Sequence, residues 1–413
     1  MKPHPLEPVR TADAPGLPEL PVQATLRRLE QEFADLLGQA TPGTGTEAGT
    51  PVYVTRPFLP PLEEFEPLLR EIWRTRILTN GGPFHRELEE RLADHLGVPH
   101  IALFNNATTA LIVALRALDL SGEVITTPYS FVATSHALMW SGLTPVFVDI
   151  DPSTLNLDPA RIEAAITPRT RAILPVHCYG QPCDVEAIAA IAARHGLKVI
   201  YDAAHAFGVR HRGASVLTHG DLSVLSFHAT KVFNTFEGGA IVCADPAMKD
   251  RIDKLKNFGF EDETSVIGVG LNGKMSELNA AFGLVQLRHI DTALAGRRAV
   301  DAAYRAGLRG LPGIRCLEAA GEGNYAYFPI LVGPDYPIGR DALYDALKRD
   351  GIHARRYFYP LISDFPAYRT LPSAARAGLP VSATMADRVL CLPIYPDLDA
   401  SVVDRVIRRI AQP

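Results

Sequence analysis

Between residues 100 and 245 short apolar runs alternate with stretches that have helical spacing, and this alternation restricts the fold more than any other feature. Apolar runs that are buried on both faces and joined by helices are typical of an open, mostly parallel sheet. We therefore predict an α/β fold with about seven mostly parallel strands and helices on both faces. The predicted strands are "HIALF" (100–104), "EVITT" (123–127), "PVFVDI" (145–150), "RAILPV" (171–176), "KVIYDA" (198–203), "LSVLSF" (222–227) and "GAIVCA" (239–244).

Changes in composition divide the chain into three predicted parts. Residues 1–50 are rich in Pro, Gly, Thr and Ala and are predicted to be a partly disordered extension, with a short amphipathic helix at 24–39. A large ligand-binding domain is predicted over 51–294 and a smaller α+β domain over 295–413. The apolar spacing of 276–308 predicts a long, possibly interrupted helix that leads out of the large domain.

Charge and hydropathy exclude several classes of protein. The chain has 413 residues, 47% hydrophobic and 21% charged, as expected for a soluble protein with a large core. Its net charge is -5 and it has no run of Lys or Arg, so no nucleic-acid partner is predicted. No apolar run is long enough to span a membrane and the N-terminus lacks a secretory apolar core, which predicts a cytoplasmic location without a membrane partner.

The five cysteines are scattered, odd in number and mostly in apolar text, so they are predicted to be reduced core thiols. The segment "HCYGQPC" (177–183) does not have the spacing of a zinc knuckle, and no second pair follows it. No metal site is predicted.

Polar residues gather directly after the predicted strands. Asp202 follows the strand at 198, Lys231 lies in the loop after the strand at 222, and Thr108 opens the helix after the strand at 100. Phe131 and His177 follow two further strands. In open parallel sheets ligands bind beyond the carboxyl ends of the strands, so these side chains are expected to meet.

An acid, a lysine, a hydroxyl-rich helix start and an aromatic at one sheet edge fit pyridoxal 5′-phosphate. This cofactor needs a lysine for a Schiff base, an acidic partner for its pyridine nitrogen and an anion cradle for its phosphate. Each residue also has an ordinary structural explanation: Lys231 as a solvated side chain, Asp202 as a helix cap, Phe131 as core. If all of these explanations were correct, the residues would lie at the same edge of the same sheet only by chance.

Ten segments from about Pro51 to the C-terminus resemble, in family order, the DegT/DnrJ/EryC1/StrS family of sugar aminotransferases that depend on pyridoxal phosphate. This family has the fold type I architecture of aspartate aminotransferase. The segments are "LTNGGPFHRELEERLADHLG" (78–97), "FNNATTALIVAL" (104–115), "PYSFVATSHAL" (128–138), "PVFVDIDPSTLNLDP" (145–159), "ILPVHCYGQPCD" (173–184), "YDAAHAFG" (201–208), "SFHATK" (226–231), "EGGAIV" (237–242), "GLNGKMSELNAAFGLVQL" (270–287) and "VLCLPIYPDL" (389–398).

The resemblance implies roles for residues at matching positions. Lys231 matches the Schiff-base lysine and Asp202 matches the carboxylate that keeps the pyridine nitrogen protonated. His205 stands where relatives often have Gln, near the ring hydroxyl of the cofactor. Ser226 matches a phosphate-binding hydroxyl.

Four further positions match the family. Ala107 and Thr108 match a turn that binds the phosphate, and Phe131 matches the aromatic that stacks on the ring. Asn272 matches an asparagine that reaches the phosphate site of the neighbouring subunit, so the resemblance implies a homodimer with shared active sites.

The resemblance also implies substrates: L-glutamate as donor, with 2-oxoglutarate as its product, and a nucleotide-linked keto sugar as acceptor. This chain has Ala229 where relatives commonly have Pro, and 232–234 where they commonly have Asn-Leu-Gly. The form "FHATKVFNTFEGG" resembles the subgroup that aminates C4 of dTDP-4-keto-6-deoxyglucose.

Other functions stay open at this point. The acceptor can instead be a 3-keto nucleotide sugar or a keto-cyclitol, and some relatives have been considered non-enzymatic regulators. The presence of both Lys231 and Asp202 disfavours a regulator, and Lys231 also argues against the sugar dehydratases that have His at this position. Arg355 and Arg356 in "HARRYFYP" are candidates to meet a diphosphate, but the sequence assigns this role to neither.

Overall fold

The computed structural model describes residues 50–318 and 323–413, so the helix predicted at 24–39 and the rest of 1–49 lie outside the described residues. The helices and strands are, in chain order, β1 (Val52–Tyr53), α2 (Leu62–Thr75), α3 (Pro83–Leu96), β2 (His100–Phe104), α4 (Ala107–Ala117), β3 (Glu123–Thr126), α5 (Ala133–Trp140), β4 (Thr144–Phe147), α6 (Pro159–Ile162), β5 (Thr170–Ile173), α7 (Val185–His195), β6 (Lys198–Asp202), β7 (Arg210–His211), β8 (Ala214–Ser215), β9 (Leu222–Ser226), β10 (Gly239–Cys243), α8 (Pro246–Leu255), α9 (Glu277–Arg288), α10 (Ile290–Leu308), β11 (Ile314–Cys316), β12 (Phe328–Val332), α11 (Arg340–Arg349), β13 (Ile352–His353), α12 (Pro380–Arg388), β14 (Val389–Leu392) and α13 (Ala400–Ala411).

All seven predicted strands belong to one sheet, with the order β2-β10-β9-β6-β5-β3-β4. β10 is antiparallel to both of its neighbours, and the other pairs are parallel. The prediction of a seven-stranded, mostly parallel sheet is therefore confirmed.

The strands are mostly apolar because both faces of the sheet are covered. In β2, Ile101 and Leu103 point into a core formed with α2, α3, α7 and α9. The alternate residues Ala102 and Phe104 point into a second core, formed with α4, α5 and α8. Alternate residues of a strand face opposite sides of the sheet, and both sides are buried here. The strands therefore read as continuous apolar runs in the sequence.

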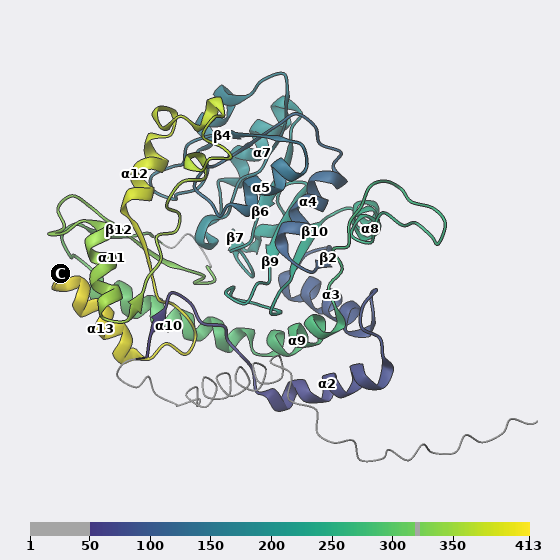
Figure 1. Ribbon diagram of the computed structural model, residues 1–413, viewed down its shortest axis with the longest axis horizontal. Coiled ribbons are helices and arrows are strands. Elements are labelled where there is room, and N and C mark those ends of the chain that lie inside the picture. Colours follow the sequence, from purple (N-terminus) through teal and green to yellow (C-terminus); the bar gives the residue numbers. More distant parts are fainter. Residues whose placement is uncertain (1–49, 319–322) are drawn as a thin grey trace, which may run out of the picture. The chain divides into compact units, whose positions relative to one another are not determined.

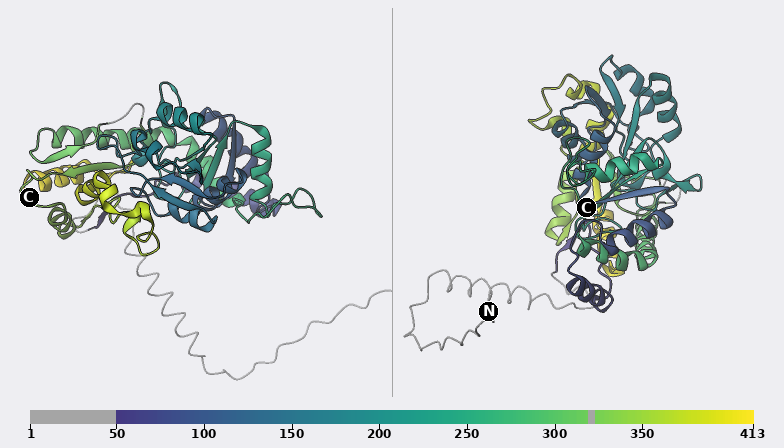
Figure 2. Two further views of the ribbon diagram at one scale, coloured as in Figure 1. Left: turned by 90° about the horizontal axis from the view of Figure 1, so that it is seen from above. Right: turned by 90° about the vertical axis from the view of Figure 1, so that its right-hand side faces the viewer.

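The predicted long helix is two helices, α9 and α10, which follow one another across the lower part of Figure 1 with a break at His289. Beyond them β11, β12 and β14 form a three-stranded antiparallel sheet against α11 and α13. This C-terminal part lies at one end of the unit in the left view of Figure 2.

The chain from Pro51 to Pro413 forms one compact unit. The boundary predicted at residue 294 falls inside α10, and β1 pairs with β13 from the C-terminal part. The division into 51–294 and 295–413 stays a prediction.

All five cysteines are unpaired, and four of them are buried, which agrees with reduced core thiols. Within the described residues, no helix is both long enough and apolar enough to cross a membrane.

Candidate active site

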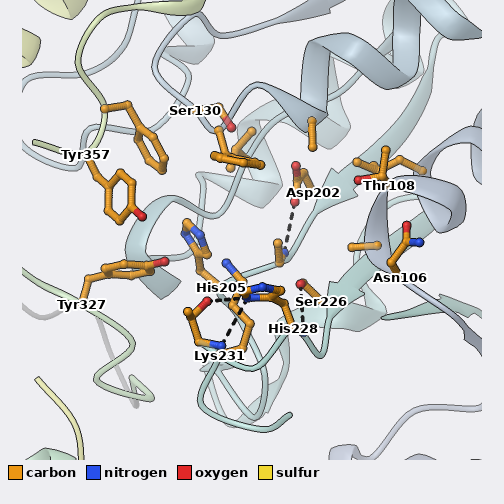
Figure 3. A pocket seen from close by; sticks show the side chains of 18 of the residues that line it. Asn106, Thr108, Ser130, Asp202, His205, Ser226, His228, Lys231, Tyr327 and Tyr357 are labelled. Carbon is orange, nitrogen blue, oxygen red and sulfur yellow. Dashed lines mark hydrogen bonds between the residues drawn. The ribbon is translucent and has the colours of Figure 1, made fainter. Parts of the chain in front are cut away.

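A cavity of about 380 Å³ opens at the carboxyl ends of β6 and β9. This is the edge of the sheet where the sequence predicts a ligand, and the volume suits a small cofactor with part of its substrate. Figure 3 shows side chains from several elements pointing into it. Seven of the eight predicted site residues line the cavity: Ala107, Thr108, Phe131, Asp202, His205, Ser226 and Lys231.

The start of α4 forms one wall of the cavity. Asn106 caps this helix, since its side-chain oxygen accepts a hydrogen bond of 2.9 Å from the amide of Thr109. The first amides of a helix have no partner within the helix and carry partial positive charge, and those of Ala107 and Thr108 lie at the cavity wall. The hydroxyl of Thr108 adds a donor, so this wall suits a phosphate.

A glycine allows the neighbouring strand to approach this helix start. A Cβ on Gly239 of β10 would lie 2.6 Å from the amide nitrogen of Ala107, too close for any side chain. On the adjacent strand β9, Ser226 places its hydroxyl at the cavity, where it accepts a hydrogen bond of 3.4 Å from the amide of His228. The hydroxyl can still donate to a bound anion.

Asp202 ends β6 and is buried. One of its oxygens accepts a hydrogen bond of 2.8 Å from the hydroxyl of Thr134, and the other accepts one of 3.1 Å from the amide of Ala204. The hydroxyls of Thr134 and Ser130 are 2.8 Å apart. Burial raises the pKa of Asp202, whereas the two hydrogen bonds and nearby Lys231 lower it. The side chain is thus held rigidly, with no ion pair among the described residues, as suits a carboxylate that awaits a cation.

Lys231 lies in the loop between β9 and β10. Its amide donates a hydrogen bond of 2.8 Å to the carbonyl of His228, and its amine lies 5.9 Å from the ring centre of Tyr327. Burial lowers the pKa of this amine to about 8, although Asp202 acts in the opposite direction. The amine is therefore neutral more often than an ordinary lysine, which makes it a nucleophile toward a carbonyl.

His205 is buried and neutral. The amide of Tyr179 donates a hydrogen bond of 3.2 Å to its Nδ1, so the proton of the neutral ring is on Nε2. Burial, together with the charge of Lys231, holds the pKa of His205 well below its ordinary value. Its ring is parallel to Phe358, with 6.1 Å between the ring centres. This geometry fixes a neutral N–H donor at the cavity.

These side chains fit pyridoxal 5′-phosphate. The buried carboxylate of Asp202 suits a pyridine nitrogen that carries a proton, and the amine of Lys231, with its lowered pKa, suits the aldehyde. The start of α4, with the hydroxyls of Thr108 and Ser226 beside it, suits the phosphate. Phe131 lines the cavity and is 59% exposed, which leaves its ring free to cover a flat ligand.

Several cavity residues were not predicted from the sequence. Ser130 lines the cavity, and Thr134 does not line it but donates a hydrogen bond to Asp202. The two residues have a weak signal in the sequence, since hydroxyls four residues apart fall on one face of a helix start.

Tyr327 and Tyr357 reach the cavity from the C-terminal part, in text where nothing indicates a site. Arg355 also lines the cavity; the sequence named it with Arg356 as a candidate for a diphosphate but assigned the role to neither.

Asn272 is the predicted site residue that does not line the cavity. It is exposed, and its carbonyl accepts a hydrogen bond of 3.4 Å from the side chain of Asn105. Its role toward a neighbouring subunit stays a prediction.

Comparisons with known proteins agree with this site. Residues 62–411 match the DegT/DnrJ/EryC1/StrS aminotransferase family. The chain is 57% identical over 364 residues to a dTDP-4-amino-4,6-dideoxy-D-glucose transaminase of Shigella dysenteriae, covering 88% of this chain and 99% of that protein. A protein of the same name from Escherichia coli is 56% identical over 358 residues, covering 86% of this chain and 96% of the relative.

Two solved structures have the same fold. DesI, crystallised in the presence of its TDP-sugar product, has a TM-score of 0.85 and 40% identity, covering 89% of this chain and 94% of DesI. The Bacillus subtilis protein ntda, with bound cofactor PMP, has a TM-score of 0.78 and 29% identity, covering 88% of this chain and 86% of ntda.

Proposed function

Because this chain belongs to the DegT/DnrJ/EryC1/StrS aminotransferase family and is a pyridoxal-phosphate-dependent aminotransferase, we propose that it transfers the amino group of L-glutamate to C4 of dTDP-4-keto-6-deoxyglucose. The products are dTDP-4-amino-4,6-dideoxyglucose and 2-oxoglutarate. The observation that carries this proposal is the 57% identity to a transaminase named for that amino sugar, over 99% of its length.

The positions of Lys231 and Asp202 in the cavity support a role for each. Pyridoxal phosphate, when bound, would supply an electron sink for the reacting carbon of the donor. Lys231 would hold the cofactor through its amine, and the same amine would act as the base for the proton on the α-carbon of the donor. Asp202 would hold a proton on the ring nitrogen through a carboxylate that Thr134 and Ala204 fix in place.

The remaining cavity residues would orient the cofactor. The amides of Ala107 and Thr108 and the hydroxyl of Ser226 would bind its phosphate. The Nε2–H of His205 would donate to the ring hydroxyl, and Phe131 would cover one face of the ring and keep water from it. Donor and acceptor use the same cavity in turn, so the kinetics are ping-pong.

We further propose that the enzyme is a homodimer and acts in the cytoplasm. The segment before Asn272 exposes large apolar side chains, among them Phe258 at 49% and Val269 at 78%, and such a surface is stable in water when a partner covers it. A second subunit would bring Asn272 to the phosphate site of its partner. The unpaired cysteines suit a reducing compartment.

The proposed acceptor is tested with a panel of keto substrates, glutamate and purified enzyme. The panel holds dTDP-4-keto-6-deoxyglucose, its 3-keto isomer and a keto-cyclitol, and the products are scored by mass and by NMR for the position of the amine. We expect kcat/KM for the 4-keto sugar to exceed that for the other two by at least about a hundredfold, because the reacting carbon must meet the cofactor in one orientation. Higher activity on the 3-keto sugar or the cyclitol would replace the proposed acceptor.

A further inference from the structure

Four residues that line the cavity have basic side chains: Lys231, His205, His228 and Arg355. His205 stays neutral, because burial and the charge of Lys231 hold its pKa well below the ordinary value. Lys231 is committed to the cofactor. His228 lies 3.7 Å from the carboxylate of Glu237, which balances its charge when the ring is protonated. Arg355 has no hydrogen bond from its guanidinium and no ion pair among the described residues. Among the described residues, Arg355 is therefore the permanent positive charge at this cavity that has no partner.

The backbone of Arg355 is fixed although its side chain is exposed. Its amide donates to the carbonyl of Cys391 at 3.1 Å, and the amide of Cys391 donates back at 2.7 Å, so the residue is paired with β14. Its charge lowers the pKa of the neighbouring Tyr357, against the larger effect of burial, which raises that pKa. The backbone of Arg355 is thus fixed by β14, and the residue lines the cavity.

The adjacent arginine differs in every one of these respects. Arg356 donates a hydrogen bond of 2.8 Å to the carboxylate of Asp341 and lies over the rings of Tyr344 and Tyr359, at 4.6 Å and 5.3 Å from their centres. It does not line the cavity. Two neighbouring residues of the same type therefore have opposite surroundings, which the sequence alone does not reveal.

We propose that Arg355 binds an oxyanion of the substrate in this cavity. Both substrates of the proposed reaction carry one: the carboxylate of the amino donor and the diphosphate of the nucleotide sugar. A guanidinium pairs with either through two parallel hydrogen bonds. The inference rests on the proposed function only for the identity of these two anions.

The test measures equilibrium binding to the holoenzyme by isothermal titration calorimetry, so it does not depend on turnover. The probes are dTDP for the diphosphate and 2-oxoglutarate for the carboxylate. The variants are Arg355→Gln and Arg355→Lys, with Arg356→Gln as the matched control for charge and position. We expect Arg355→Gln to raise the Kd of at least one probe by about tenfold to a hundredfold, the loss typical of a charged hydrogen-bonded pair. Arg355→Lys should give an intermediate Kd.

The probe whose Kd rises in Arg355→Gln identifies the oxyanion that Arg355 binds. If both Kd values rise, Arg355 binds both oxyanions. The inference is overturned if Arg355→Gln leaves both Kd values within about threefold of the wild type, as for an exposed charge without a specific partner. It is also overturned if Arg356→Gln weakens binding equally. Failure of the proposed function looks different, because the wild-type enzyme would then bind these probes yet not aminate the 4-keto sugar.

Discussion

Replacing Lys231 by alanine is expected to lower turnover by more than about a thousandfold, because the amine both holds the cofactor and moves the proton. The same change should abolish the visible absorbance of covalently held cofactor, since no other lysine lines the cavity. Turnover is measured with glutamate and dTDP-4-keto-6-deoxyglucose, and the spectrum is recorded on the purified protein.

Lys348→Ala is the control for this change. Lys348 is exposed on α11, away from the cavity, so its loss should leave both the rate and the spectrum unchanged. Turnover of the Lys231 variant at a rate near that of the wild type would mean that another group performs the chemistry.

Replacing Asp202 by asparagine is expected to lower kcat by at least about a hundredfold, with a much smaller change in KM for glutamate. The amide has nearly the shape of the carboxylate but lacks the negative charge that holds the proton on the ring nitrogen. The loss should therefore fall on the chemical step, which is measured in single turnovers with glutamate. An unchanged kcat would remove Asp202 from the mechanism.

Thr134→Val gives a graded control for the same interaction. The hydrogen bond from Thr134 lowers the pKa of Asp202, so its loss raises that pKa further. Activity needs the ionised carboxylate and is lost as the pH falls, so the acidic limb of kcat should move to higher pH. Thr134→Ser keeps the hydroxyl and should restore the wild-type profile. If the pH dependence of kcat were unchanged in Thr134→Val, the hydroxyl of Thr134 would have only a structural role.

The strands of the sheet could be predicted because their physical cause is visible in the sequence. Each strand is buried on both faces, so most of its positions are apolar, and helices separate most of the runs. The antiparallel direction of β10 was not predicted, since burial produces the same apolar run in either direction. The break at His289 was anticipated only as a possible interruption of the helix.

The part of the site formed by the seven-stranded sheet could also be predicted, for a related reason. Asp202 and Ser226 end neighbouring parallel strands, and the carboxyl ends of such strands meet at one edge. The roles of these residues came from the family resemblance, whereas their meeting in one cavity is a finding of the structure.

The rest of the site could not be assigned from the sequence. Tyr327 and Arg355 reach the cavity from outside the seven-stranded sheet, close to β12 and β13, and no periodicity relates them to the Lys231 loop. For Arg355 and Arg356, composition is identical and only the direction of each side chain separates them. Asn272 depends on a second chain, whose position no pattern within one sequence specifies.

The central claim is that Lys231 in this cavity is the residue that carries the cofactor. Treating the wild-type enzyme with borohydride fixes the cofactor to whichever lysine holds it, and peptide mass mapping then locates the added mass. We predict a single modified peptide that contains Lys231, and loss of the label when glutamate is added before the borohydride. A label on any other lysine, or no label on a protein that is active, would contradict the account.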